Sequence, residues 1–235
     1  MAPLKALGLD GMPPLYYQNY WQLFGNDVTQ SILNFLNTAT LPSHLNHTYV
    51  TLIPKVKSPK LISDYRLISL CNVLYKIFSM VLANRLKMVP PNIITEHQSA
   101  FTKSKLIIDN ILVAFKTLHS MQKHKGKDDY MATKLDMRNA YDRVEWSYLE
   151  AVMKKMGFGE QWIKLMMVYV KTVTYSTPIN GQLKGLINPT HSIRQGDPFP
   201  PFPFLLCTEG LHGLISQEAT LGNLSGFSIC RITPN

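Results

Sequence analysis

The feature that most constrains this chain is a short apolar segment that leads directly into a turn and a helix. Residues 131–137 predict a strand with the carboxylate of Asp136 at its end. Tyr141 and Asp142 follow where the chain turns toward the next predicted helix. A strand end holds a carboxylate in a fixed position, whereas Asp142 in a first helical turn complements the positive end of the helix dipole. The pattern therefore predicts an ordered site at Asp136 and a mainly structural role for Asp142.

Helices and short strands account for most of the remaining sequence. Apolar residues at helical spacing predict helices over residues 16–36, 68–88, 107–121, 148–156, 161–171 and 204–216. β-branched and aromatic residues predict a strand at 49–53, and residues 173–176 open a hairpin around the turn Asn180-Gly181. Residues 123–129 are polar and predict a surface connector. Together these elements, with an antiparallel sheet, indicate an α+β fold.

Size and cysteine usage exclude several classes of protein. With 235 residues, 46% of them hydrophobic, the chain can bury a core in one or two domains. No apolar run reaches the roughly 18–20 residues that span a bilayer, and the N-terminus lacks a secretion signal pattern. Cys71, Cys207 and Cys230 are scattered without CxxC spacing. We therefore expect reduced thiols in an intracellular protein, cytoplasmic or nuclear, with no zinc site and no membrane partner.

Positive charge is concentrated in one part of the sequence. The net charge is +9, and residues 51–105 contain nine Lys or Arg but only Asp64 and Glu96 as acids. The cations are Lys55, Lys57, Lys60, Arg66, Lys76, Arg85, Lys87, Lys103 and Lys105. Such a block suits a phosphate-rich partner such as a nucleic acid. A solvated helix face is the alternative that charge alone leaves open.

Two further groups of residues suit a nucleotide. Lys55 and Arg66 can clamp a triphosphate, since arginine presents a planar fork and lysine a point charge, although a basic loop beside a strand explains them equally well. Gln195 can hydrogen-bond a nucleotide or template base, and Gly196 permits close backbone approach.

The residues on either side of Gln195 and Gly196 receive structural roles. Asp197 can cap the helix predicted after it, which makes its role mainly structural. Arg194 begins the loop and carries no specific role by itself. As a free-standing pattern this loop is weak, but it follows the Asp136 segment by about 60 residues and comes after a hairpin, which makes it more specific.

Six segments in one order strongly resemble the reverse transcriptase of non-LTR (long interspersed element) retrotransposons, of the kind abundant in plants. They are residues 52–55, 65–73, 82–86, 96–101, 135–146 and 194–198. The resemblance extends from about residue 4 to 229. It implies a partial right-hand polymerase fold, with an N-terminal helical extension at 1–48, a fingers-like region at 49–130 and an incomplete palm at 131–235.

The resemblance also implies a reaction and a set of roles. The reaction is magnesium-dependent nucleotidyl transfer from deoxynucleoside triphosphates to a DNA primer on an RNA template. Asp136 resembles the first catalytic, metal-binding aspartate, and Tyr141 resembles the aromatic gate that rejects a ribose 2′-hydroxyl. Lys55 and Arg66 resemble residues that bind the triphosphate, and Gln195 with Gly196 resembles the contact to the incoming nucleotide and template. A core aromatic in a helix turn remains the alternative for Tyr141.

Several positions depart from the family pattern. Leu67 stands where the family has a proline, and residues 6–11 and 100–105 have lost further turn residues. Pro200 and Pro203 are extra prolines at the start of the helix predicted at 204–216. A proline inside a helix costs about 3 kcal/mol, so this helix is expected to begin late or to fray at its start.

The largest departure concerns the other catalytic aspartates of the family. The family places them in a hairpin motif such as FADD after the glutamine–glycine loop, but the only acids after Asp197 here are Glu209 and Glu218. One carboxylate cannot build a two-metal site. We therefore expect a truncated domain that is inactive as given. A non-catalytic nucleic-acid-binding remnant and a non-functional pseudogene product are the alternatives.

Overall fold

The computed structural model describes residues 7–88, 93–95, 98, 106–125, 129–137 and 139–227. The chain forms two compact units, each made of two separate stretches of sequence. Unit 1 combines residues 1–89 with 139–204, and unit 2 combines residues 90–138 with 205–235. The expected motif residues Glu96, His97 and 99–101 lie outside the described residues, as do residues 102–105.

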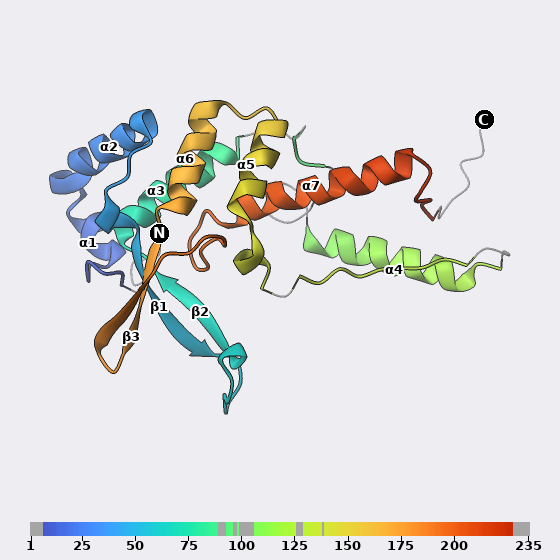
Figure 1. Ribbon diagram of the computed structural model, residues 1–235, viewed down its shortest axis with the longest axis horizontal. Helices are drawn as coiled ribbons and strands as arrows, with labels where there is room; N and C mark the ends of the chain where they lie inside the picture. The colour runs from blue at the N-terminus through green and yellow to red at the C-terminus, as the bar shows by residue number, and fades with distance from the viewer. Residues whose placement is uncertain are drawn as a thin grey trace. The chain divides into compact units, whose positions relative to one another are not determined.

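The helices of unit 1 follow the predicted pattern closely (Figure 1). They are α1 (Pro14–Asn19), α2 (Trp21–Thr38), α3 (Val73–Leu86), α5 (Trp146–Lys155), α6 (Glu160–Lys171) and the first residues of α7 (Pro201–Thr220). The helices predicted at 16–36, 148–156 and 161–171 are thereby confirmed. Gly157 follows the C-terminus of α5 with a φ of +80°, the left-handed conformation that favours glycine after a helix.

A four-stranded mixed sheet completes unit 1. Its strands are β1 (His47–Pro54), β2 (Tyr65–Leu70), β3 (Thr174–Ile179) and β4 (Gln182–Ile187), in the order β2-β1-β3-β4. The β1–β2 and β3–β4 pairs are antiparallel, but β1 and β3 run parallel. The α+β class is confirmed, whereas a purely antiparallel sheet is wrong. Asn180 and Gly181 both have positive φ, as the predicted β3–β4 turn requires.

The helix predicted at 68–88 was placed too early in the sequence. Ile68, Ser69 and Leu70 belong to β2, where Ser69 pairs with Val50 and Leu70 with Tyr49. The helix α3 begins only at Val73. A short apolar run fits a buried strand as well as a helix, and here the pairing with β1 decides between them.

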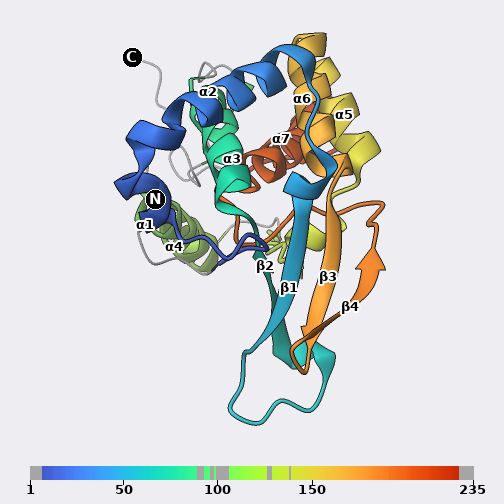
Figure 2. The same ribbon diagram turned by 90° about the vertical axis from the view of Figure 1, so that its left-hand side faces the viewer.

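The core of unit 1 lies where the helices meet the sheet. Figure 2 shows α2, α3 and α6 gathered at the end of the sheet where β1 begins, while the β1–β2 hairpin extends away from them. The largest fully buried side chains include Phe35 of α2, Tyr75 and Leu82 of α3, Leu149 of α5 and Met166 of α6. The helices therefore fix the base of the hairpin, and its tip remains in solvent.

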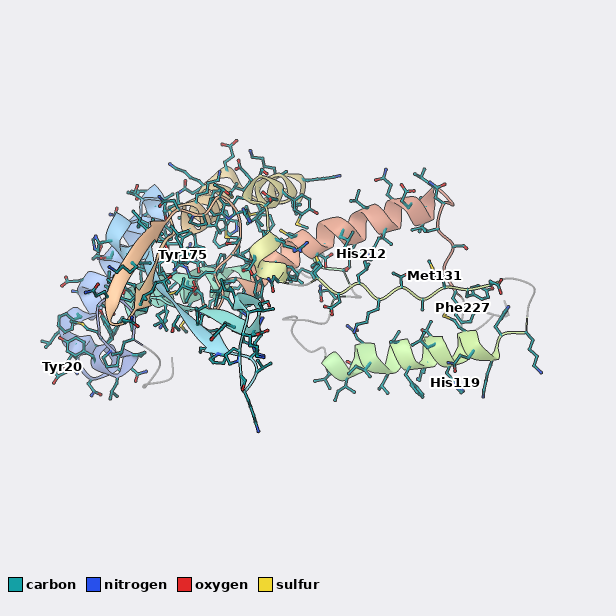
Figure 3. All side chains as sticks on the ribbon, turned by 60° about the horizontal axis from the view of Figure 1, so that its bottom comes forward. Tyr20, His119, Met131, Tyr175, His212 and Phe227 are labelled. Atoms are coloured by element: carbon teal, nitrogen blue, oxygen red, sulfur yellow. The ribbon has the colours of Figure 1, made fainter. Side chains whose placement is uncertain are left out.

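Unit 2 contains α4 (Ile107–Lys123), the remainder of α7 and an extended segment at 129–137. The helix predicted at 107–121 is confirmed. The strand predicted at 131–137 is wrong, because these residues form no strand and pair with no strand of the described chain. The side chain of Met131 is 86% exposed (Figure 3), so apolar composition here does not reflect burial.

The helix α7 begins earlier than its prolines predict. It starts at Pro201 and includes Pro203 in its first turn, and the amide of Phe204 donates to the carbonyl of Pro200 over 3.3 Å. The first amides of a helix have no acceptor within the helix, so prolines there remove no hydrogen bond. The expected late start is therefore wrong. Among the described residues, no helix is long and apolar enough to cross a bilayer.

Candidate functional site

The hairpin of β1 and β2, with its connecting loop, carries four cations. Lys55, Lys57, Lys60 and Arg66 are all exposed on it or on its connecting loop. The amide of Lys55 donates to the carbonyl of Asp64 over 2.7 Å, and its Nζ donates to the carbonyl of Ser63 over 3.0 Å. The hairpin and its loop thus carry four exposed cations, with Asp64 as the acid between them.

The rest of the basic block does not form one continuous surface. Lys76 is buried within α3, whereas Arg85 and Lys87 are exposed near the end of that helix. Lys103 and Lys105 lie outside the described residues. The positive surface that the structure supports is therefore smaller than the sequence block.

The loop at 194–198 lies against β2 near the C-terminal end of that strand. The amide of Ser69 donates to the carbonyl of Gln195 over 3.2 Å. Gly196 has a φ of +100°, and a Cβ there would lie 3.4 Å from the carbonyl oxygen of Ser69. This conformation favours glycine, and it places the exposed Gln195 and Gly196 beside the strand that carries Arg66.

Arg194 precedes this exposed pair and is itself buried. Its guanidinium donates to the backbone carbonyl and the side-chain oxygen of Asn46 and to Sγ of Cys71, and it lies 4.3 Å from the ring centre of Tyr75. No described carboxylate forms an ion pair with it. The charge is therefore stabilised mainly by polar oxygens and by the face of an aromatic ring, an arrangement that is strong when water is excluded.

Asp197 follows the pair and is buried as well. Its carboxylate accepts hydrogen bonds from the hydroxyls of Ser79 on α3 and Tyr169 on α6. Burial raises the pKa of Asp197, while the charge of Arg194 and these hydrogen bonds oppose that shift. The carboxylate also interacts with the backbone amide of Phe199, just before α7, so its predicted role as a helix cap stays a prediction. Its side chain in addition ties the loop to two helices of unit 1.

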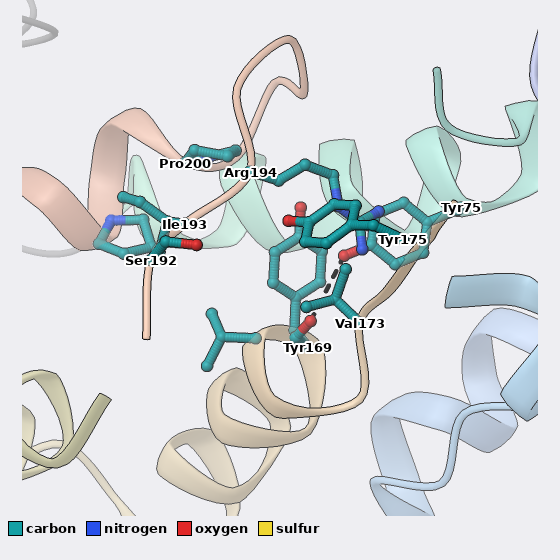
Figure 4. A pocket seen from close by; sticks show the side chains of 10 residues that line it. Tyr75, Tyr169, Val173, Tyr175, Ser192, Ile193, Arg194 and Pro200 are labelled. Atoms are coloured by element: carbon teal, nitrogen blue, oxygen red, sulfur yellow. Dashed lines mark hydrogen bonds between the residues drawn. The ribbon is translucent and has the colours of Figure 1, made fainter. Parts of the chain in front are cut away.

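Two tyrosines link these buried charges. Tyr75 and Tyr169 stack with their ring centres 5.1 Å apart, and burial raises the pKa of both. Beside them lies a cavity of about 10 Å³, room for about one water molecule, which Arg194 also lines (Figure 4). Nε of Arg194 has no hydrogen-bond partner among the described residues. No local pattern predicts this cluster, because its members come from distant segments of the sequence.

Tyr141 lies in a short 3₁₀ helix, η4 (Ala140–Arg143). It is half-buried, with its ring 5.4 Å from that of Phe204 in an edge-on contact, and burial raises its pKa. The carbonyl of Tyr141 accepts a hydrogen bond from the amide of Ile193 over 2.9 Å. Asp142 is exposed in the first turn, as predicted, and its amide donates to the carbonyl of Asn139.

The predicted site residues fall into both units. Unit 1 contains Lys55, Arg66, Tyr141, Gln195 and Gly196, and backbone hydrogen bonds connect the segments that carry them. Asp136 belongs to unit 2, where it is exposed on the extended segment. The residues that resemble nucleotide contacts are therefore positioned by one folded unit.

The described side chains do not fit a magnesium site. No three His, Cys, Asp or Glu residues in the described part of the chain gather as metal ligands. Magnesium in a two-metal site needs more than one well-fixed carboxylate, and Asp136 is exposed on a segment without strand pairing. Asp136 alone cannot supply that geometry.

Comparison with known proteins relates the chain to one polymerase family and to transposable elements. The family model described as reverse transcriptase (RNA-dependent DNA polymerase) matches residues 53–231. The uncharacterized 149 kDa protein of transposon TX1 from Xenopus laevis is 26% identical over 216 residues, which are 92% of this chain and 16% of that protein. The Pol polyprotein from type-1 retrotransposable element R2 of Popillia japonica is 26% identical over 202 residues, 79% of this chain and 28% of that protein.

A third relative is similar over a shorter stretch. An uncharacterized mitochondrial protein of Arabidopsis thaliana is 43% identical over 79 residues, 34% of this chain and 57% of that protein. The chain therefore spans less than two thirds of the length of each of these relatives.

Proposed function

Since the chain belongs to the reverse transcriptase (RNA-dependent DNA polymerase) family, we propose that it forms the fingers and part of the palm of a non-LTR retrotransposon polymerase. Its partners are then an RNA template, a DNA primer and deoxynucleoside triphosphates. The observation that carries the proposal is the hydrogen bond that joins Gln195 to Ser69 of β2, the strand that also carries the exposed Arg66.

Each residue of this arrangement receives a role from its chemistry. Lys55 and Arg66 bind triphosphate oxygens, because both are exposed cations of one hairpin. Gln195 has an exposed amide that hydrogen-bonds the nascent base pair, while Gly196 lets the backbone approach it. Tyr141, held half-buried against Phe204, excludes a ribose 2′-hydroxyl by its bulk.

The family reaction uses magnesium, and Asp136 is the residue of this chain that resembles one of its ligands. The described residues do not complete that site. The proposal therefore assigns to this chain the binding and orientation of nucleic acid and nucleotide, and it derives no step through a metal.

The proposal predicts salt-dependent binding of an RNA–DNA template–primer. Replacement of both Lys57 and Lys60 by alanine should make the plot of log affinity against log salt shallower by about 1–2 units, because each phosphate contact contributes about 0.9 for a duplex. Fluorescence anisotropy with a labelled primer at several salt concentrations measures this slope.

The matched control is the double replacement of Lys155 and Lys164 by alanine. These lysines are exposed on α5 and α6, so the variant has the same net charge while the hairpin is unchanged. Its slope should equal that of the original chain. Equal slopes in all three proteins, or no binding at low salt, would contradict the proposal.

A further inference from the structure

A second pocket of unit 1 lies away from the loop at 194–198. Residues of α1, α2, α3 and the 3₁₀ helix η1 (Ser43–Asn46) enclose a volume of about 430 Å³. Tyr17, Val28, Leu45 and Phe78 line it and are buried, so its floor is apolar. This volume lies within the range typical of sites for small ligands or anchoring side chains.

The wall of the pocket is aromatic on one side. The ring of Tyr16 lies 5.8 Å from that of Tyr17 and 5.5 Å from that of Phe24, and all three residues line the pocket. The ring of Tyr20 extends the cluster at 5.2 Å from Tyr16, and Tyr20 itself is 49% exposed (Figure 3). Aromatic faces carry negative partial charge and attract cations.

The rim of the pocket has one carboxylate. Asp27 lines the pocket and is exposed, and its carboxylate forms no ion pair or hydrogen bond with any described residue. The other polar lining residues are neutral hydroxyls and amides and the imidazole of His44. The carboxylate is therefore available to a partner.

The N-terminal region that contributes most of this pocket differs from the rest of the chain in its charge. Residues 1–50 contain Lys5 as their single Lys or Arg, and Asp10 and Asp27 as their acids, although the whole chain carries a net charge of +9. A phosphate backbone would find no lysine or arginine in the pocket lining. Most of the lining also precedes residue 53, where the family match begins, so the pocket is largely separate from the polymerase motifs.

We propose that this pocket binds a segment of a polypeptide in which an aromatic residue stands next to a lysine or arginine. The aromatic side chain fills the apolar floor, and the neighbouring lysine or arginine pairs with Asp27. The aromatic ring removes apolar surface from water against Val28, Leu45 and Phe78. The cation meets the one carboxylate of the rim and the faces of the tyrosine cluster. Charge complementarity therefore selects this partner over an acidic one.

A pair of dipeptides tests the proposal on the full 235-residue chain. N-acetyl-Trp-Lys-amide and N-acetyl-Trp-Glu-amide are titrated separately, and methyl resonances of Val28 and Leu45 are followed by NMR. We expect the lysine peptide to shift these resonances and to bind several-fold more tightly than the glutamate peptide. Asp27→Asn should weaken the lysine peptide about two- to fivefold, the range of an exposed ion pair, and should not weaken the glutamate peptide.

Two further variants make the result decisive. Glu145→Gln removes an exposed carboxylate of unit 1 outside the pocket and should leave both affinities unchanged. Ser31→Trp places a large side chain on the exposed rim and should abolish binding while the thermal unfolding transition is retained. Equal binding of both peptides, or binding that survives Ser31→Trp, would overturn the proposal. Self-association that Ser31→Trp abolishes would also overturn it, because the occupant would then be a second copy of the chain.

Discussion

Replacement of Asp197 by alanine is expected to lower the free energy of unfolding of the chain by about 2–5 kcal/mol. The buried hydroxyls of Ser79 and Tyr169 both donate to this carboxylate. Without it Ser79 would lose its acceptor, and Tyr169 would keep only the Oγ of Ser79, at 3.2 Å. A buried polar group left unsatisfied costs about 1–3 kcal/mol. The charge of Arg194 would also lose the carboxylate that interacts with it inside the unit. Urea denaturation followed by tryptophan fluorescence measures the loss.

The conservative control is Asp197→Asn. Asparagine has nearly the same shape and keeps a side-chain oxygen that accepts a hydrogen bond from one hydroxyl, so it should cost clearly less than alanine. If the alanine variant lost no more stability than the asparagine variant, the cluster would not be holding the loop. Thermal unfolding of both variants, measured in parallel, distinguishes these results.

Asp197 should also give the stability of the chain a defined pH dependence. Burial raises the pKa of Asp197 in the folded chain above its ordinary value of 3.8. As pH rises above 3.8, the unfolded chain releases this proton before the folded chain does, so the contribution of Asp197 to the free energy of unfolding falls until its raised pKa is passed. Asp197→Asn has no such group and should lack this slope. Identical pH profiles for the two proteins would contradict the expectation.

Local pattern was sufficient for most elements of unit 1. The apolar spacing of α2, α5 and α6 and the turn Asn180-Gly181 are properties of neighbouring residues, and they predicted the observed elements. The helix prediction was wrong for residues 68–70 because they form a strand through pairing with β1, which no local pattern reveals. The strand prediction was wrong for residues 131–137 because their apolar composition suggested a strand, although the segment pairs with no described strand.

The candidate site was less accessible from the sequence than the fold. Ser69 and Gln195 are far apart in the chain, and only the fold brings their backbones into a hydrogen bond beside the strand of Arg66. The order of the motifs predicted the candidate site residues through a family resemblance, but it did not predict how these residues are arranged in space. The burial of Arg194 depends on Asn46 and Tyr75, two residues from different segments whose types indicate no such contact. The catalytic and nucleotide-binding roles remain predictions.

The buried cluster around Arg194 and Asp197 holds the exposed residues of the loop in position. Arg194 and Asp197 hold both ends of the loop inside unit 1, and Gln195 and Gly196 are exposed between them. Side chains held by packed neighbours place adjacent groups more accurately than a free loop does. The nucleotide contacts proposed for Gln195 would therefore depend on residues that touch no nucleotide.

The 235-residue chain by itself is expected to give no primer extension above background on an RNA template with a DNA primer, deoxynucleoside triphosphates and magnesium. Nucleotidyl transfer by two metals requires several fixed carboxylates around the reacting phosphate, and this sequence offers Asp136 as its single predicted metal ligand. Asp136 is exposed on an unpaired extended segment, which does not fix it as a strand would. Gel analysis of a labelled primer tests this, with a complete reverse transcriptase as the positive control.

Asp136→Ala is the variant that decides how an unexpected signal is interpreted. Extension that Asp136→Ala abolishes would contradict the prediction, since it would show that this carboxylate works in a complete site. Extension that the variant leaves unchanged would come from a contaminating polymerase, because no metal-dependent step of the chain could then pass through Asp136. Binding of the template–primer without extension would show that nucleic-acid binding and nucleotidyl transfer have separate requirements. Phosphate contacts need only the exposed cations of the hairpin. In-line transfer needs carboxylates that are fixed around the metals.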